Sequence, residues 1–198
     1  MQDEKNFTHV ESLALIESMI NKATNRFNED GFLYLLWGWV VLLCSVAEFI
    51  LLRIQYEKHY LVWVLTWAAV IYQIFFLRKK HRRQTVRTYT DDILKYVWIT
   101  FIVLMFLSGF LFGAILGDNY YKMIDPVFLL LYGMPTFLSG IILRFKPLIR
   151  GGIGCWLLSI LCTVIPIDYQ LLLVSAAMII AWIIPGYLLR SKFKQANG

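Results

Sequence analysis

Residues 31–52 read GFLYLLWGWVVLLCSVAEFILL, and Glu48 is the only charged residue among them. An α-helix of about 20 apolar residues crosses the hydrocarbon core of a bilayer, so this stretch predicts a membrane span. Five more apolar stretches follow it, and the six predicted spans are residues 31–52, 60–77, 96–116, 126–145, 150–166 and 169–189. The apolar part of the fifth, residues 151–165, is shorter than the usual ~17–25 residues. It therefore needs its flanks, a tilt or a locally thin bilayer to cross.

Composition gives the same class of protein. Of the 198 residues, 59% are apolar and 16% are charged, whereas soluble domains have about 45–50% apolar and about 25% charged residues. We predict an all-α fold, a polytopic membrane helical bundle of six transmembrane helices in residues 31–190. Residues 1–30 are predicted to form a cytoplasmic amphipathic helix, and residues 191–198 a basic cytoplasmic tail. Because residues 1–30 are polar and acidic, they do not resemble a cleavable signal peptide, and the first span is expected to act as the insertion signal.

The basic residues lie mainly at one end of the predicted spans. Sixteen Lys and Arg fall in the N-terminal segment, the loop after the second span, the turn after the fourth span and the C-terminal tail, while three fall on the opposite side. Cytoplasmic loops of membrane proteins are enriched in Lys and Arg. Both termini are therefore expected in the cytoplasm, and the net charge of +6 is explained chiefly by orientation.

The N-terminal segment carries a helical pattern over residues 8–29. Thr8 and Glu11 have the spacing of a capping box. The apolar residues of this segment recur every three or four positions, at Leu13, Ile16, Ile20, Ala23 and Phe27. Since its polar face is mixed to acidic, whereas lipid-surface helices usually have a basic one, we expect it to dock on the protein's own cytoplasmic face or on a partner protein.

Two basic segments have two interpretations each, as orientation signals and as binding sites for an anionic ligand. Residues 78–83 read RKKHRR directly after the second span; nucleic acid is not expected there, because no aromatic platform accompanies the charges. After the fourth span the sequence places three cations before two glycines, namely Arg144, Lys146, Arg150, Gly151 and Gly152. A glycine-rich helix N-terminus with nearby cations suits a lipid phosphate, although orientation and a tight turn explain the same residues without a ligand.

Glycine and proline mark three of the spans. Gly109, Gly113 and Gly117 recur every four residues and predict a face for helix packing, and homo-oligomer formation through such a face stays open. Prolines inside the fourth and sixth spans predict breaks in the helices, at Gly133 and Pro135 and at Pro185 and Gly186. Broken helices can frame a transporter's substrate site. A cavity of that kind would be lined by Thr66, Tyr132, Thr136 and Ser139.

Few residues inside the spans suggest chemistry. Glu48 lies near the outer end of the first span, where we expect it to pair with Arg53 or with a Trp or Tyr donor; a proton or cation role is the alternative. The three cysteines lie in apolar runs without metal-ligand spacing, at Cys44, Cys155 and Cys162. We therefore expect neither an enzyme nor a metal or cofactor site.

Several short motifs are distributed along the whole chain after the N-terminal helix. They are Leu36-Trp37-Gly38-Trp39, Thr88-Tyr89-Thr90-Asp91, Leu131-Tyr132-Gly133, Phe137-Leu138-Ser139-Gly140, Phe145-Lys146-Pro147-Leu148 with Gly151-Gly152, and Ile184-Pro185-Gly186-Tyr187. In this combination the chain resembles a family of small bacterial multi-pass membrane proteins with no established activity. The resemblance implies six membrane helices and the bacterial inner membrane.

The residues leave two functions open. The first is a scaffolding or regulatory membrane protein that binds anionic lipid and a partner protein through its cytoplasmic face and N-terminal helix. The second is a small-solute transporter or channel built around the breaks at Pro135 and Pro185. A water-filled cavity at mid-membrane depth would favour the second, and a closely packed interior would favour the first.

Overall fold

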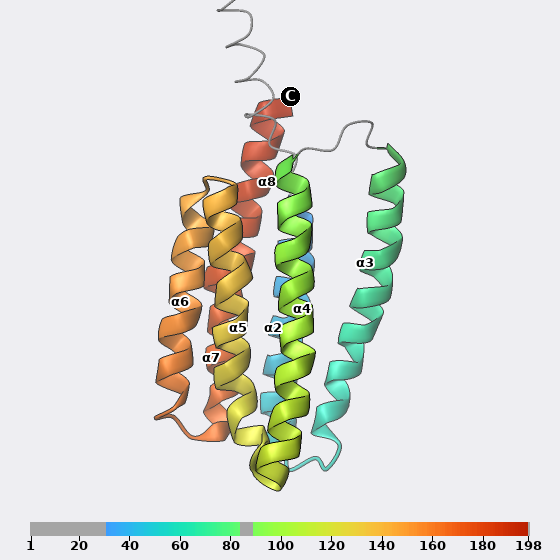
Figure 1. Cartoon of the computed structure of the whole chain (residues 1–198). Helices are drawn as coiled ribbons and strands as arrows, with labels where there is room; N and C mark the ends of the chain where they lie inside the picture. Colours follow the sequence, from blue (N-terminus) through green and yellow to red (C-terminus); the bar gives the residue numbers. More distant parts are fainter. Residues whose placement is uncertain (1–30, 84–88, 198) are drawn as a thin grey trace, which may run out of the picture.

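The computed structural model describes residues 31–83 and 89–197, and every element in these two ranges is helical (Figure 1). The elements are α2 (Phe32–Arg53), η1 (His59–Trp63), α3 (Val64–Arg83), α4 (Tyr89–Leu116), η2 (Gly117–Asn119), α5 (Tyr121–Ile142), α6 (Lys146–Cys162), α7 (Ile167–Met178), η3 (Ile179–Ile183) and α8 (Ile184–Asn197). The last three follow one another without a gap and form one long rod. The predicted amphipathic helix within residues 1–30 lies outside the described residues.

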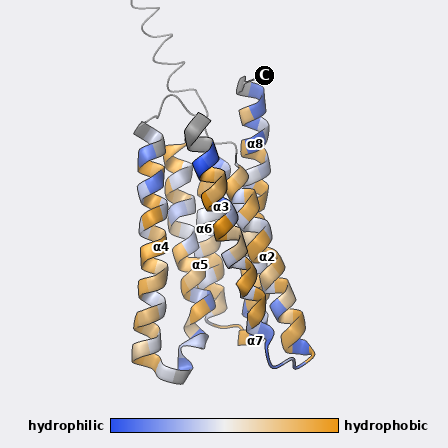
Figure 2. Cartoon of the chain, turned by 90° about the vertical axis from the view of Figure 1, so that its right-hand side faces the viewer, coloured by the Kyte–Doolittle hydropathy of each residue, from blue (hydrophilic) through white to orange (hydrophobic). Residues whose placement is uncertain are grey.

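Five helical segments are long and apolar enough to cross a membrane: Phe32–Arg53, His59–Lys79, Asp92–Leu116, Tyr121–Ile142 and Ile167–Gln195. Figure 2 shows apolar residues along these helices and hydrophilic residues toward their ends. The expected class, an all-α polytopic membrane protein, is therefore confirmed. The remaining predicted span corresponds to α6, which is a helix of 17 residues.

The boundary between the fourth and fifth predicted spans is displaced toward the N-terminus. The helix predicted to reach residue 145 ends at Ile142, because Arg144 adopts a left-handed conformation with φ of 50°. The Phe145 N–H then donates to the Gly140 carbonyl at 2.8 Å, and the Arg144 N–H donates to Ile141 at 3.0 Å. This is the Schellman arrangement that closes a helix C-terminus. The next helix consequently begins at Lys146 and ends at Cys162, rather than covering residues 150–166.

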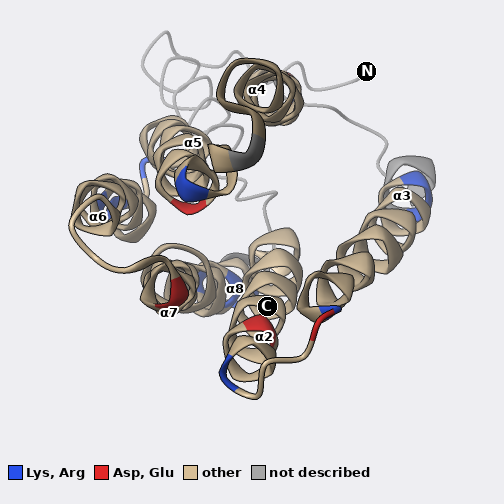
Figure 3. Ribbon diagram, turned by 90° about the horizontal axis from the view of Figure 1, so that it is seen from below, with Lys and Arg blue, Asp and Glu red and all other residues tan. Residues whose placement is uncertain are grey.

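The bundle has an interior group of helices and an edge. In the candidate spans of α2, α5 and the α7–α8 rod, 28%, 44% and 56% of the residues are buried, against 6% in each of the spans of α3 and α4. α5 packs mainly on α6, α2 packs mainly on α7, and α3 contacts only α2 and η1 among the described elements. Seen along the bundle, α3 and α4 form its periphery (Figure 3).

Glycines set the distances between the interior helices. A Cβ atom added at Gly140 would lie 2.6 Å from the backbone nitrogen of Ile149 on α6, and one added at Gly151 would lie 2.6 Å from the Cα of Ala181 on η3. Both positions therefore exclude a side chain. Helices in lipid gain little from the hydrophobic effect when they touch, so close backbone approach of this kind is what holds them together.

The regularly spaced glycines of α4 behave differently. Nothing described lies within 4 Å of a Cβ atom built at Gly109, Gly113 or Gly117. The prediction that this stripe packs against a neighbouring helix is therefore not met within the described chain. The physical reason is the position of α4 at the edge, where its helix contacts are with α5 and η2.

We predict opposite effects for the same substitution at two glycines. Gly151→Ala should lower the free energy of unfolding by about 1–3 kcal/mol, as overpacking does, since its new methyl group meets backbone atoms of η3. Gly113→Ala should leave stability unchanged or raise it by up to about 1 kcal/mol, the helix-propensity difference between the two residues. Unfolding in mixed micelles of a mild detergent and dodecyl sulfate measures both. Equal losses in the two variants would contradict this packing.

Candidate functional site

The residues predicted to bind a lipid phosphate do not form one surface. Arg144, Lys146 and Arg150 are exposed around the turn from α5 to α6, but Gly151 and Gly152 are buried. A Cβ atom at Gly152 would lie 2.6 Å from the Cβ of Phe137 on α5. Because α6 begins at Lys146, these glycines lie in its second turn and serve helix packing. The two glycines therefore do not form an open helix start for an anion, while binding of a lipid phosphate by the three exposed cations stays a prediction.

The two prolines disturb their helices less than a break would. α5 stays helical from Tyr121 to Ile142, with Pro135 inside it. In the other rod, the five residues before Ile184 form a π-helical turn, η3, and helix resumes at Pro185 and Gly186. Proline has no N–H for the carbonyl four residues earlier, and a wider turn accommodates that loss without ending the helix.

The π-helical turn directs Trp182 into the interior, where it meets the other proline-containing helix. Its Nε1–H donates to the Thr136 hydroxyl at 2.9 Å, and this hydroxyl donates to the Tyr132 carbonyl at 2.7 Å. Both Trp182 and Thr136 are buried. The hydroxyl next to Pro135 therefore both donates and accepts a hydrogen bond within the protein.

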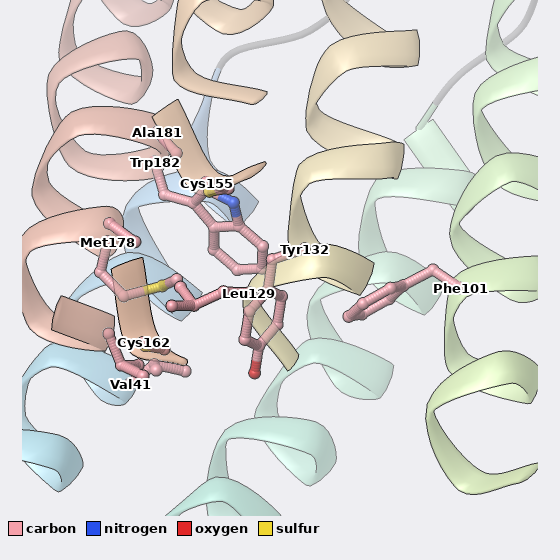
Figure 4. Packing of buried hydrophobic residues seen from close by; sticks show 11 residues of the cluster. Val41, Phe101, Leu129, Tyr132, Cys155, Cys162, Met178, Ala181 and Trp182 are labelled. Carbon is pink, nitrogen blue, oxygen red and sulfur yellow. The ribbon is translucent and has the colours of Figure 1, made fainter. Parts of the chain in front are cut away.

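Aromatic rings fill the space around this contact. The Trp182 ring lies edge to face with Tyr132 at 5.3 Å and with Trp98 of α4 at 5.6 Å between centroids, and such pairs are favourable. Figure 4 shows Trp182 beside Tyr132, with Phe101 on the other side of Tyr132 from Met178. Through Trp98 and Phe101, the edge helix α4 is anchored to the interior.

Of the residues predicted to line a solute cavity, Tyr132, Thr136 and Ser139 are buried, while the Thr66 hydroxyl donates to the Trp63 carbonyl at 2.6 Å. The Ser139 hydroxyl is buried without a hydrogen-bond partner among the described residues. Two hollows of about 300 and 130 Å³ lie instead between α4 and α5, and each opens sideways. Neither is lined by any of these four residues.

Glu48 forms a polar cluster near the end of the bundle opposite the α5–α6 turn. Its Oε2 atom accepts a hydrogen bond from Trp63 Nε1 at 2.6 Å, and its Oε1 atom accepts one from His59 Nδ1 at 2.9 Å. An ionised carboxylate only accepts hydrogen bonds, so two donors match its two oxygens. The Asp125 carboxyl on α5 is close enough to the Glu48 carboxyl for the two groups to interact electrostatically.

The partners of Glu48 differ in part from the expectation. A tryptophan donor is present, but the Arg53 guanidinium lies over the rings of Phe49 and Tyr169, at 5.3 and 4.9 Å from their centroids, and not on the carboxylate. His59 was not anticipated, because it lies outside the predicted spans. Its position in the short connection after the first span could have indicated the contact, because that connection turns the chain back toward Glu48.

This cluster ties η1, and therefore the start of α3, to α2. Near the middle of α3, Trp37 Nε1 donates to Gln73 Oε1 at 2.6 Å, and slightly further along the rings of Phe32 and Phe76 stack at 4.4 Å. The arrangement is suited to holding an edge helix in place. The described ranges contain no group of three or more His, Cys, Asp or Glu residues placed to hold a metal ion.

We predict that Glu48→Ala lowers the free energy of unfolding by about 1.5–3 kcal/mol, the range for hydrogen bonds to charged groups, and changes the emission of Trp63. Glu57→Ala, at an exposed position of the same connection, should stay within about 0.5 kcal/mol of the wild type. Chemical unfolding followed by tryptophan fluorescence compares the two. Equal free energies of unfolding for Glu48→Ala and Glu57→Ala would show that the Glu48 carboxylate does not anchor α3.

Comparison of the chain with protein-family models, with curated proteins and with solved structures finds no match. What the fold defines is the class, a polytopic α-helical membrane protein with a closely packed group of interior helices and two weakly buried edge helices.

Proposed function

We propose that the protein is a scaffolding or regulatory subunit of the bacterial inner membrane, with six spans and both termini in the cytoplasm. The sixth span is α6, which is packed against α5, α7 and η3. The end of the bundle where α2 and α4 begin is strongly basic. Its exposed cations in the described residues are Arg78, Lys79, Lys95, Arg144, Lys146, Arg150, Arg190, Lys192 and Lys194. By the positive-inside rule, this end faces the cytoplasm.

The scaffolding role rests on one observation, the contrast between the interior and the edge. The hydroxyl of Thr136 and the rings around Trp182 are engaged with one another, which favours a scaffold over a transporter that exposes such groups to a solute. Meanwhile α3 and α4 are long apolar helices that the described chain leaves almost uncovered. Exposed apolar surface of this extent marks a site of contact with a membrane or with protein, and in the proposed scaffold a partner protein covers part of it while lipid covers the rest.

The N-terminal segment provides the second contact to a partner. It joins the bundle at Gly31, whose φ is 68° and whose added Cβ would lie 2.5 Å from the Gly186 carbonyl of α8. The segment is therefore attached at the basic end, close to the cytoplasmic ends of α2 and α8. An amphipathic helix at residues 8–29 would there present its apolar stripe to the protein's own face or to a partner.

The six-span topology is testable by cysteine labelling, with Cys44, Cys155 and Cys162 replaced by alanine. Val164→Cys, in the turn between α6 and α7, should react with a membrane-impermeant maleimide on intact spheroplasts. Ser191→Cys, in α8, should react only after lysis. Both positions are exposed. Labelling of the turn only after lysis would mean that α6 does not cross.

The scaffolding role is testable by photo-cross-linking in the native membrane. A photoreactive residue at Phe75 of α3 or Phe110 of α4, which are 65% and 74% exposed, should give one shared protein adduct. The same residue at Ile160 of α6, which is 69% exposed, should give lipid adducts and serves as the control. Protein adducts at none of the three positions, or equally at all three, would contradict the proposal.

The contribution of the N-terminal helix is tested separately by deleting residues 1–30. The truncated protein should lose the partner identified by the shared adduct while retaining its thermal stability. Unchanged co-purification of that partner would rule out the N-terminal contact and leave only the contact through α3 and α4.

A further inference from the structure

The larger of the two lateral hollows has a lining unlike that of the packed interior. It measures about 300 Å³ and opens between α4 and α5. Four residues of α4 and two of α5 line it: Ile93, Tyr96, Val97, Thr100, Met134 and Leu138. The residues of α4 are spaced three or four apart and those of α5 four apart, so one face of each helix forms a wall. The lining is apolar apart from one hydroxyl on Tyr96 and one on Thr100.

The hollow lies near the basic end of the bundle. The apolar window of α4 begins at Asp92, so Ile93 and Tyr96 occupy its first turn, where headgroups meet acyl chains. Tyr96 is 64% exposed, as is usual for an aromatic residue at this level of a membrane. A lipid bound in the hollow would therefore stay in contact with the bilayer and would place its polar headgroup at the membrane–water interface.

One cation lies beside a lining residue of the hollow, and a second follows the end of the other lining helix. The Lys95 ammonium lies 5.8 Å from the centroid of the Tyr96 ring, which itself lines the hollow. Lys95 forms no ion pair with a carboxylate of the described residues. On the other wall, α5 ends one turn after Leu138, and the exposed Arg144 follows. Among the described side chains, Asp92 is the exposed acidic residue near Lys95, and Lys95 and Arg144 together outnumber it.

We propose that this hollow binds one acyl chain of an anionic glycerophospholipid, with the lipid phosphate held by Lys95 and Arg144. The apolar walls require hydrocarbon, because a small soluble anion would leave them exposed to water. The cations require a negative headgroup, since a basic pocket beside membrane helices attracts anionic lipid at short range. The site shares Arg144 with the α5–α6 turn, but its hydrocarbon pocket lies between α4 and α5 and does not include Gly151, Gly152 or the surface of α3.

Native mass spectrometry tests the site with the full-length protein released from nanodiscs of equal phosphatidylglycerol and phosphatidylcholine. The wild type should retain one phosphatidylglycerol in preference to phosphatidylcholine. Lys95→Gln should reduce this retention about fivefold, as expected from the loss of one interfacial cation. Lys122→Gln, which removes an exposed cation at the other end of α5, should leave it unchanged and is the matched control.

A second variant separates the chain from the headgroup. Val97→Trp fills the hollow and should reduce retention of both lipids, whereas Lys95→Gln should reduce only that of phosphatidylglycerol. Equal effects of Lys95→Gln and Lys122→Gln would overturn the proposal, as would equal retention of the two lipids by the wild type. If Val97→Trp fails to fold, the comparison of the two lysine variants still decides the outcome. None of these results depends on a protein partner.

Discussion

Close approach of helix backbones is the constraint on which this bundle depends. In lipid, a leucine gains nothing by leaving one apolar neighbour for another, so helices associate where their surfaces fit tightly. Gly140 lets the end of α5 lie against the start of α6, and Gly151 lets α6 lie against η3. These two contacts bring together the helices that carry Thr136 and Trp182, and the hydrogen bond between those residues becomes possible only at that spacing.

The sequence predicted the class of fold because the class follows from composition and from the length of apolar runs. It did not predict the helix ends around residue 144, because a left-handed residue at a helix terminus is usually glycine or asparagine, and here it is arginine. It predicted a packing face at Gly109, Gly113 and Gly117, and no helix of the described residues covers that face. Regular spacing at Gly109, Gly113 and Gly117 shows that a helix face is smooth, but only the arrangement of the whole chain decides whether a neighbour reaches it.

The sequence could likewise predict some of the polar contacts and not others. An aromatic donor for Glu48 could be anticipated, because a carboxylate near the membrane interface needs donors and tryptophan is common there. His59 could not, since its approach depends on how η1 turns back toward α2. Breaks were predicted at both prolines, yet α5 stays helical through Pro135 and a π-helical turn precedes Pro185, because the effect of a proline on a helix depends on the surrounding packing. Thr136 and Trp182 are 46 residues apart, beyond the reach of any local pattern.

The edge helices acquire their character from the same constraint. α3 is fixed to α2 by a polar contact just before its start, at Glu48, and by one near its middle, at Gln73, and α4 is fixed to the interior by Trp98 and Phe101. Single side-chain contacts of this kind position a helix without covering its surface, whereas the contacts at glycines bring two helix backbones close together. Both edge helices thus stay attached while exposing most of their apolar length. In the proposed scaffold, lipid and a partner protein would share the exposed faces of α3 and α4, and a lipid would be held most firmly where a hollow such as that beside Tyr96 adds shape and charge.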